Sequence, residues 1–462
     1  MKYNFKFLML IIWVAAMGGL LFGYDWVVIG GAKIFYEPYF DITTPYMKGW
    51  GTSSALIGCI LGALFCFLYS DRYGRRFVLI MSALMFCFGA LGTAMANSFT
   101  VYNIFRIVGG IGIGISLNQS PIYIAEMSPA HLRGKFVSIN QLMINIGILL
   151  AQVINWRIAL MDTEIPVHAT AEIIRQSWSG QTGWRLMFGM QLIPALLFFI
   201  LMILLPESVR WLVKNGQALK AGKILAKIGG KAYAETEVAS IKETIKDEAA
   251  TIQFGELFRG KLFKVILLGI FITLFQQWCG MNAIFYYAAD IFKAAGYDMK
   301  EMMLQIVVIG TIMVLSVLVT IMVVDKIGRK TLMLFGAASL AIVYIIEGYF
   351  FHIGYIGLPI IILTLASVAF YSFTLAPVQW VILSEIFPNR IRGTAMSFVA
   401  IIMWFGNFTL TFMFPAINEA LGWAKNFWLY ALICMAGFIV LAIFLPETKG
   451  KSLEEIEKQL IG

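Results

Sequence analysis

Charged side chains are scarce in this sequence of 462 residues. Asp, Glu, Lys and Arg together make up 13% of the chain, whereas hydrophobic residues make up 60%. A soluble domain usually carries about 25% charged residues, so this composition excludes an ordinary soluble enzyme or binding module. The excess of 35 Lys and Arg over 26 Asp and Glu indicates the topology of a membrane protein and not an affinity for nucleic acid.

Cysteine and histidine are also rare. The cysteines Cys59, Cys66, Cys87, Cys279 and Cys434 lie in apolar segments without a CxxC pair, which argues against a disulfide framework or a zinc site. The three histidines have no metal-ligand spacing. We therefore expect no metal and no cofactor. Because no nucleophile–base pattern is visible, we also expect that the protein is not an enzyme.

Long apolar runs dominate the chain. A membrane-spanning helix needs about 20 mostly apolar residues. Twelve stretches qualify: 7–32, 50–70, 77–97, 101–126, 134–157, 184–205, 262–293, 302–324, 331–351, 356–386, 391–417 and 424–445. If both termini and the Lys-rich break at 206–261 face the cytoplasm, most Lys and Arg residues lie on the cytoplasmic side, as the positive-inside rule requires.

This pattern predicts an all-α membrane protein with twelve transmembrane helices. Its expected parts are an N-terminal six-helix bundle (1–205), a cytoplasmic helical linker (206–261), a C-terminal six-helix bundle (262–445) and a cytoplasmic tail (446–462). The lipid bilayer is then an obligatory partner, and no nucleic acid is expected.

Three motifs occur once in each half, in the same order. They are D-R-Y-G-R-R from Asp71 and D-K-I-G-R-K from Asp325; E-x-x-P-x-x-x-R-G from Glu126 and from Glu385; and P-E-S from Pro206 and P-E-T from Pro446. This repetition predicts two bundles related by a pseudo-two-fold axis. Repeated halves of this kind are typical of transporters whose binding site lies at the membrane midplane.

The repeated motifs place acids and bases together at the predicted cytoplasmic ends of the helices. In the first half we expect cytoplasmic gating contacts among Asp71, Arg75, Glu126 and Arg133. In the second half the expected set is Glu207, Asp325, Arg329, Glu385 and Arg392. Such pairs can form when a gate closes and break when it opens. Simple positive-inside charge with helix capping is the alternative, and it explains the paired acids poorly.

These motifs resemble those of the sugar porter family of the major facilitator superfamily. The sequence also has P-E-S-x-R-W from Pro206, Q-Q-x-x-G-x-N from Gln276 and P-E-T-K-G from Pro446. The resemblance covers essentially the whole chain. It is greatest to the bacterial proton–xylose symporters and more distant to facilitative glucose transporters. It implies the major facilitator fold, alternating access, and a monomeric multi-pass protein of the plasma or bacterial inner membrane.

Amide and aromatic side chains occur in the middle of several predicted spans. Amides donate and accept hydrogen bonds, and aromatic rings pack against the C–H faces of sugars. The candidate substrate-binding residues are Phe22, Gln141, Gln276, Gln277, Asn282, Tyr286, Trp380, Trp404 and Asn407. The resemblance implies sugar contacts for Gln141, Gln276, Gln277, Asn282, Tyr286 and Trp380. A single buried glutamine can instead make an interhelical hydrogen bond of about 0.6 kcal/mol, so the interpretation depends on the set.

Two positions differ from the proton–xylose symporters of the family. Those members have a glutamine at the position of Met403 and a glycine at that of Ala376. Met403 cannot supply the hydrogen bonds of an amide. Either the sugar differs, or Gln379, Asn118 or Asn407 supplies the contact. The expected substrate is therefore a monosaccharide, either a pentose or a hexose.

Asp25 and Arg106 are charged residues well inside predicted spans. A carboxylate near the bilayer centre costs about 2.5–3.5 kcal/mol on insertion scales. By resemblance, proton-coupled sugar porters have these two residues, whereas facilitative members have asparagine at the first position. A nearby Arg106 keeps Asp25 ionised, and its departure favours protonation. A static buried ion pair is the alternative.

The repeat gives Asp25 a counterpart. Aligning Gly23-Tyr24-Asp25 with Gly280-Met281-Asn282 pairs Asp25 with the candidate sugar ligand Asn282. The proton–xylose symporters also have a glutamate in the sixth helix, where this chain has Gln191. We therefore expect a symporter of a monosaccharide and a proton. A passive facilitator and a non-transporting sugar receptor stay open as alternatives.

Overall fold

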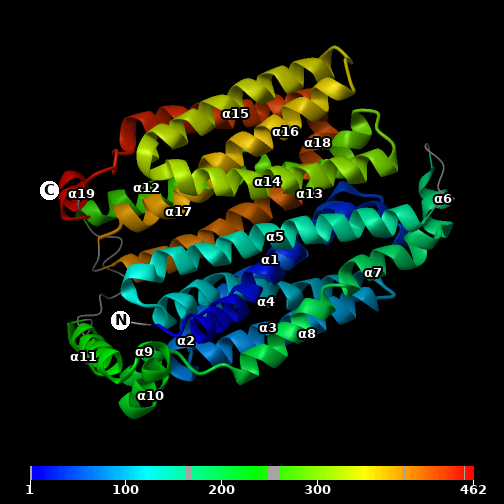
Figure 1. Ribbon diagram of the computed structural model, residues 1–462. Helices are drawn as coiled ribbons and strands as arrows, with labels where there is room; N and C mark the ends of the chain where they lie inside the picture. Colours follow the sequence, from blue (N-terminus) through cyan, green and yellow to red (C-terminus); the bar gives the residue numbers. More distant parts are fainter. Residues whose placement is uncertain (1–2, 163–168, 248–259, 389–390, 452, 462) are drawn as a thin grey trace. The chain divides into compact units, whose positions relative to one another are not determined.

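The computed structural model describes residues 3–162, 169–247, 260–388, 391–451 and 453–461, and every regular element among them is a helix. In chain order (Figure 1) the elements are α1 (Phe5–Tyr39), α2 (Pro45–Tyr73), α3 (Arg75–Ala94), α4 (Phe99–Met127), η1 (Ala130–Leu132), α5 (Arg133–Met161), α6 (Ala171–Gln176), η2 (Ser179–Gly183), α7 (Trp184–Gly189), α8 (Leu192–Leu204), α9 (Val209–Lys214), α10 (Ala218–Gly229), α11 (Lys231–Asp247), α12 (Gly260–Trp278), α13 (Met281–Ala294), α14 (Met299–Ile327), α15 (Arg329–His352), α16 (Leu358–Phe373), α17 (Leu375–Ile386), α18 (Arg392–Phe444) and α19 (Leu453–Ile461). The predicted all-α class is confirmed.

The predicted spans agree with these helices to within a few residues at most ends. Among the described residues, 11 helical stretches are long and apolar enough to cross a membrane. The twelfth predicted span lies in α18, which has 53 residues and contains a non-helical position at Gly422, with φ of 74°. Gly422 adopts this left-handed conformation without the steric cost that a Cβ would bring. It separates the last two predicted spans.

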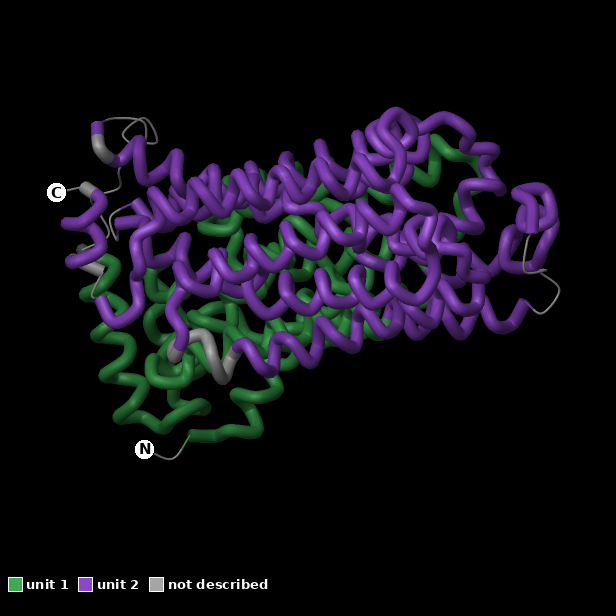
Figure 2. The backbone as a smooth tube through the Cα atoms, turned by 90° about the horizontal axis from the view of Figure 1, so that it is seen from above, with its two compact units in different colours: residues 1–26, 57–150, 188–251 green, residues 27–56, 151–187, 252–462 purple. Residues whose placement is uncertain are grey.

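The chain folds into two compact units that do not follow the order of the sequence (Figure 2). Unit 1 contains residues 1–26, 57–150 and 188–251, and unit 2 contains residues 27–56, 151–187 and 252–462. The long helix α1 therefore contributes its first part to unit 1 and its last part to unit 2.

Close helix packing fixes the interior of unit 1. A Cβ atom on Gly58 of α2 would lie 2.0 Å from the carbonyl oxygen of Ile107 on α4. A Cβ atom on Gly23 of α1 would lie 2.0 Å from the carbonyl oxygen of Ile144 on α5. Small residues that let backbones approach this closely are typical of helix interfaces in membranes. These contacts hold the segments of α1 and α4 that carry Asp25 and Arg106.

In unit 2, two of the predicted spans are broken into consecutive helices. Gly280, with φ of 93°, separates α12 from α13. Thr374, with φ of −117° and ψ of −80°, separates α16 from α17. Transporters typically build substrate sites at discontinuous helices of this kind, because the break exposes polar groups.

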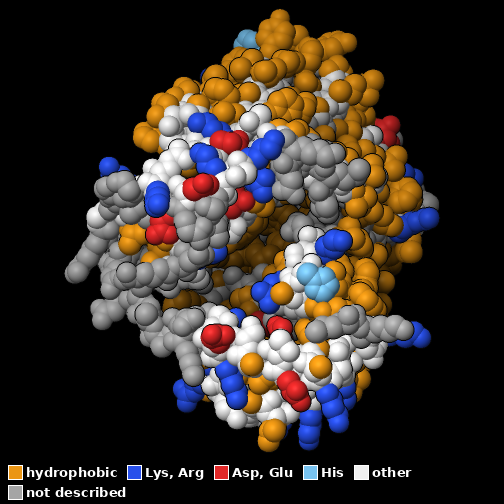
Figure 3. Space-filling view, turned by 60° about the vertical axis from the view of Figure 1, so that its left-hand side comes forward, with side chains coloured by type: hydrophobic (Ala, Val, Ile, Leu, Met, Phe, Trp, Pro, Cys, Tyr) orange, Lys and Arg blue, Asp and Glu red, His pale blue; other side chains and the backbone are white. Residues whose placement is uncertain are grey.

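Side-chain types are segregated on the surface. Figure 3 shows hydrophobic side chains along the flank of the helices, and Lys, Arg, Asp and Glu gathered on the face turned forward. The predicted linker region contains α9, α10 and α11, which belong to unit 1. An apolar flank with charged ends suits helices that cross a bilayer.

Candidate transport site

Asp25 and Arg106 form a buried ion pair in unit 1. Nη1 of Arg106 donates to Oδ1 of Asp25 at 2.5 Å, and the side chains of Arg106 and Asp25 are only 4% and 3% exposed, respectively. The other carboxylate oxygen, Oδ2, is buried and accepts no hydrogen bond from any residue that the structure describes. The structure therefore contains the ion pair predicted from the sequence. Only one of the two carboxylate oxygens of Asp25 takes part in it.

An aromatic ring and a glycine lie beside the pair. Cζ of Arg106 lies 5.1 Å from the ring centroid of Phe188, at the distance of a cation–π contact. A Cβ atom on Gly109 would lie 3.8 Å from Oδ2 of Asp25, so glycine keeps that side open. Gln191, directly before α8, is buried, and its Nε2 lies 3.4 Å from the carbonyl oxygen of Leu21 on α1. Gln191 thus joins α8 to the helix that carries Asp25.

Two of the predicted sugar ligands lie in unit 1. Phe22 is buried on α1 and stacks on Trp26, with ring centroids 5.6 Å apart. Gln141 is exposed on α5. Gln141 is thus accessible to a ligand, whereas Phe22 is covered and lies three positions before Asp25 on α1.

Unit 2 contains a chain of hydrogen-bonded amides at the break between α12 and α13. Gln276 donates to the hydroxyl of Tyr371, and Gln277 donates to Oε1 of Gln276. Asn282 donates to Oε1 of Gln277 at 2.8 Å. Linked hydrogen bonds polarise one another and fix the orientation of each amide. The structure therefore brings three of the predicted sugar ligands together.

The other candidates of unit 2 are distributed over three helices. Tyr286 on α13 is 3% exposed, and Trp404 and Asn407 on α18 are 2% and 4% exposed. Asn407 accepts a hydrogen bond from Thr411 at 3.0 Å. Trp380 on α17 is half-buried. Gln379, weighed as a substitute ligand, is buried and lies 3.4 Å from Oγ1 of Thr273; Met403 is also buried.

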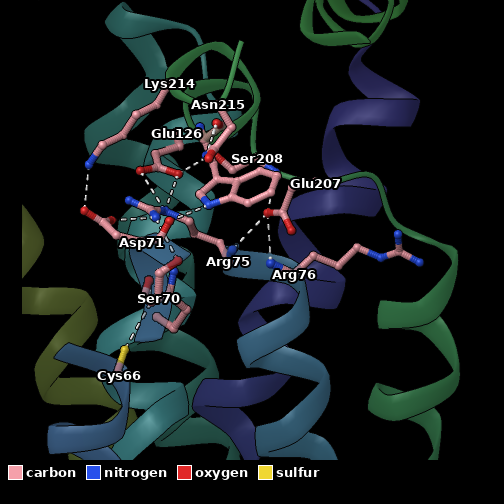
Figure 4. A network of polar contacts seen from close by, with 12 residues as sticks. Cys66, Ser70, Asp71, Arg75, Arg76, Glu126, Glu207, Ser208, Lys214 and Asn215 are labelled. Atoms are coloured by element: carbon pink, nitrogen blue, oxygen red, sulfur yellow. Dashed lines mark hydrogen bonds and ion pairs between the residues drawn. The ribbon is translucent and has the colours of Figure 1, made fainter. Parts of the chain in front are cut away.

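Unit 1 also contains the predicted gating residues of the first half (Figure 4). Arg75, at the start of α3, binds Asp71 at 2.7 Å and Glu126 of α4 at 3.1 Å. Lys214 of α9 binds the other oxygen of Asp71 at 2.7 Å, and Ser208 donates to Glu126. The ends of four helices are thus joined through one arginine and two acids. Arg133 is exposed and donates to the carbonyl oxygen of Ala125 at 3.1 Å.

The assignment of Glu207 to the second-half gating set is wrong. Glu207 belongs to unit 1, where Oε1 accepts from the backbone N–H groups of Arg75 at 2.9 Å and Arg76 at 3.0 Å. Because these donors have no partner within their own helix, the glutamate caps the N-terminus of α3. Glu447 does the same in unit 2, accepting from the N–H of Arg329 at 3.0 Å.

The remaining second-half residues lie in unit 2. Nε of Arg329 is 3.3 Å from Oε1 of Glu385, which repeats the contact between Arg75 and Glu126. Arg392 donates to the carbonyl oxygen of Phe387 at 3.3 Å. The side chain of Asp325 lies outside the part that the structure describes.

Three charged residues inside the helices were not predicted from the sequence. Because α1 continues to Tyr39, Lys33 lies within a helix and not in a loop, and its ammonium binds Asp290 of α13 at 2.5 Å. Glu347 of α15 is fully buried and accepts from Thr364 at 2.6 Å. The sequence contains a signal for the pair of Lys33 and Asp290. These residues are 257 positions apart, which is the offset that relates Asp25 to Asn282 in the repeat.

Comparison with known proteins gives consistent results. The family model described as "Sugar (and other) transporter" matches residues 11–460. The chain is 35% identical to the arabinose-proton symporter of Bacillus subtilis, and the match covers 99% of this chain and 96% of that protein. It is 36% identical to the D-xylose-proton symporter of Escherichia coli over the same shares.

Solved structures agree with the sequence comparison. The partially occluded, inward-open conformation of the xylose transporter from E. coli matches with a TM-score of 0.84 and 33% identity, over 97% of this chain and 100% of that chain. The proton:xylose symporter bound to 6-bromo-6-deoxy-D-glucose matches with a TM-score of 0.79 and 35% identity, over 99% and 100%. The chain has the major facilitator fold and belongs to the sugar (and other) transporter family, which confirms the resemblance of its motifs.

Proposed function

We propose that this protein is a proton-coupled monosaccharide symporter that works by alternating access. The observation that carries the proposal is the buried pair of Asp25 and Arg106. Next to the guanidinium, the carboxylate is stabilised in its charged form. If the arginine moves away during the transport cycle, an unpaired carboxylate in an apolar interior takes up a proton. Sugar and proton then cross together.

The proposed substrate is a pentose or a hexose. The amide chain of Gln276, Gln277 and Asn282 supplies donors and acceptors for hydroxyl groups, and Tyr286 and Trp404 supply aromatic surface. Relatives named as arabinose, xylose and glucose transporters support a monosaccharide. The buried Met403 supports a sugar preference different from that of the xylose-transporting relatives.

The proposed topology places both termini, the linker of residues 206–261 and the tail from residue 446 in the cytoplasm. The positive-inside distribution of Lys and Arg supports this orientation. The contacts of Arg75 with Glu126, and of Arg329 with Glu385, then lie at the cytoplasmic ends of the helices. We propose that they act in the cytoplasmic gate, in a monomer of two six-helix bundles (1–205 and 262–445).

Gln191 favours a second candidate function, a passive facilitator. The motif resemblance implies a glutamate at this position in proton–xylose symporters, and an amide cannot carry a proton. The facilitator and the symporter differ in one measurable property, because only the symporter accumulates sugar above its external concentration when a proton gradient is imposed.

The test is uptake of a panel of pentoses and hexoses into proteoliposomes, with and without an inward proton gradient. A symporter accumulates at least one sugar severalfold when the gradient is present, and a protonophore abolishes the accumulation. Equilibration without accumulation would identify a facilitator instead. Sugar binding without any flux would identify a receptor.

A further inference from the structure

Lys33 is buried in the part of α1 that belongs to unit 2. Its side chain is 2% exposed, and Nζ lies 2.5 Å from Oδ2 of Asp290 and 3.6 Å from Oε1 of Glu37. Nζ also lies 3.9 Å from the ring centroid of Tyr287 on α13. The ammonium is thus held between α1 and α13 by one acid from each helix and by an aromatic ring.

The two members of the ion pair differ in their access to solvent. Asp290 is 38% exposed, and a cavity of about 340 Å³ lies beside the pair. Its lining contains the charged residues Lys33, Lys48, Asp290 and Glu419, together with aromatic rings. If α13 moves away, water can solvate Asp290 through this cavity, whereas the buried Lys33 loses its partner across the helix interface. Leaving one charge of a buried pair without its partner is costly, so the pair favours the arrangement in which α1 and α13 are in contact.

The repeat connects this pair to the sugar ligands. Lys33 follows Asp25 by eight residues on α1, and Asp290 follows Asn282 by eight residues on α13. Asn282, Tyr286 and Asp290 all belong to α13, a helix of 14 residues. A movement of α13 as a whole that separates Asp290 from Lys33 therefore also moves two candidate sugar ligands, Asn282 and Tyr286.

The backbone of α13 is interrupted on both sides of Tyr286. Gly280, before the helix, has a φ of 93°, and Tyr287 departs from helical geometry with φ of −123° and ψ of 19°. Hinges are typically a few residues at the ends of elements, where the backbone angles can change. The interruption at Gly280 makes α13 a segment that can move separately from α12.

We propose that Lys33 and Asp290 are positioning residues of a gate on α13: their ion pair holds Asn282 and Tyr286 in place when the gate is closed, and it opens to admit sugar through the adjacent cavity. This inference depends on the proposed transport function. It assigns a role to the ion pair of Lys33, near the C-terminal end of α1. This pair is distinct from that of Asp25 and Arg106, which is proposed to couple the proton.

The geometry predicts an order of effects among single substitutions. Lys33→Met leaves Glu37 and Asp290 facing each other as like charges, which favours opening. Asp290→Asn removes the attraction between the helices but leaves Lys33 its contact with Glu37 on the same helix. Glu37→Gln keeps the pair between the helices. Opening of the gate is therefore expected to increase in the order Glu37→Gln, Asp290→Asn, Lys33→Met.

The opening can be measured without any transport. The five native cysteines are buried, and Ala289 is a buried residue of α13, three positions after Tyr286. In an Ala289→Cys background, a membrane-impermeant maleimide should label the introduced thiol at least fivefold faster with Lys33→Met than without it. The double substitution Lys33→Asp with Asp290→Lys exchanges the two charges. It should return the labelling rate to within about twofold of the rate of the Ala289→Cys protein that keeps Lys33 and Asp290. Lys293→Met, which removes an exposed lysine of the same helix, is the matched control and should have no effect.

Sugar kinetics give the second measurement. A gate biased open should lower the maximal rate of sugar exchange about tenfold, because the return step requires closure, and should leave KM unchanged or lower it. Unchanged labelling in both Lys33→Met and Asp290→Asn would overturn the inference, and so would a charge exchange that labels as fast as Lys33→Met. If the unsubstituted protein moves no sugar, the proposed function fails, while the labelling result still decides whether the pair closes α13.

Discussion

Oε1 of Glu207 accepts a hydrogen bond from the backbone N–H of Arg75 at 2.9 Å, and this contact begins α3. Glu447 and Arg329 repeat it at 3.0 Å at the start of α15. In both places a glycine with positive φ precedes the arginine, and a Cβ atom there would collide with the glutamate. The P-E-S/T and D-x-x-G-R motifs therefore recur together because each glutamate caps the helix that the other motif begins.

Replacing the Glu447 cap should cost stability in a pH-dependent way. Burial alone would raise the pKa of Glu447, but backbone N–H donors, those of Lys449 and Arg329 among them, outweigh it and hold the pKa below its usual value. A carboxyl with a lowered pKa stabilises the fold above its unfolded pKa of about 4.3, and this stability is lost as pH falls through the folded value.

Glu447→Gln is therefore expected to lower the free energy of unfolding by about 1 kcal/mol at pH 7, the size of a typical cap. The difference from the native protein should shrink as the pH falls below about 4.3. Thermal unfolding in detergent at pH 7 and pH 4 measures both quantities, with the exposed Glu235→Gln as control. A difference that stays constant across this range would contradict the assigned role.

Two of the three ion pairs in the Arg75 cluster of unit 1 should differ in strength. Arg75 and Glu126 are 11% and 10% exposed, whereas Lys214 and Asp71 are 47% and 61% exposed. Water screens the exposed pair, which should couple by less than about 1 kcal/mol. The part-buried pair should couple by about 1–3 kcal/mol. Double-mutant cycles of thermal stability, with alanine at each position, measure both couplings, and equal values would refute the assignment of Arg75 and Glu126 as the main contact.

Sugar preference should respond to residue 403. Met403 is buried next to Trp404, and Met403→Gln introduces the amide that the motif resemblance implies at this position in proton–xylose symporters. One added hydrogen bond of about 1 kcal/mol corresponds to a roughly fivefold gain in xylose affinity. Competition of xylose against the preferred sugar measures the change. Met403→Leu should give no gain, and the prediction fails if glutamine and leucine behave alike.

Most of the membrane architecture could be predicted from the sequence, because it depends on the length of apolar runs. Hydropathy is insensitive to breaks within a run, so the interruptions at Gly280 and Thr374 were not expected. Hydropathy also placed the end of the first span at residue 32, one residue before Lys33. The mean apolarity of a segment cannot show that two charges, 257 positions apart, neutralise each other.

Side-chain contacts could be predicted from the sequence where residue type and repetition agreed. The pair of Asp25 and Arg106 and the amides from Gln276 to Asn282 were both expected, because polar groups inside apolar helices require partners. The contacts of Glu207 with the first half were not predicted, because its partners are the backbone N–H groups of Arg75 and Arg76.

The most direct test of the central claim is sugar accumulation by Asp25→Asn in proteoliposomes with an inward proton gradient. Asparagine keeps the shape of the side chain but cannot take up a proton. We predict that accumulation above the external concentration is lost, while exchange of labelled for unlabelled sugar stays within about threefold of the native rate, since exchange does not require net proton release. Gradient-driven accumulation that persists in Asp25→Asn would show that another group carries the proton.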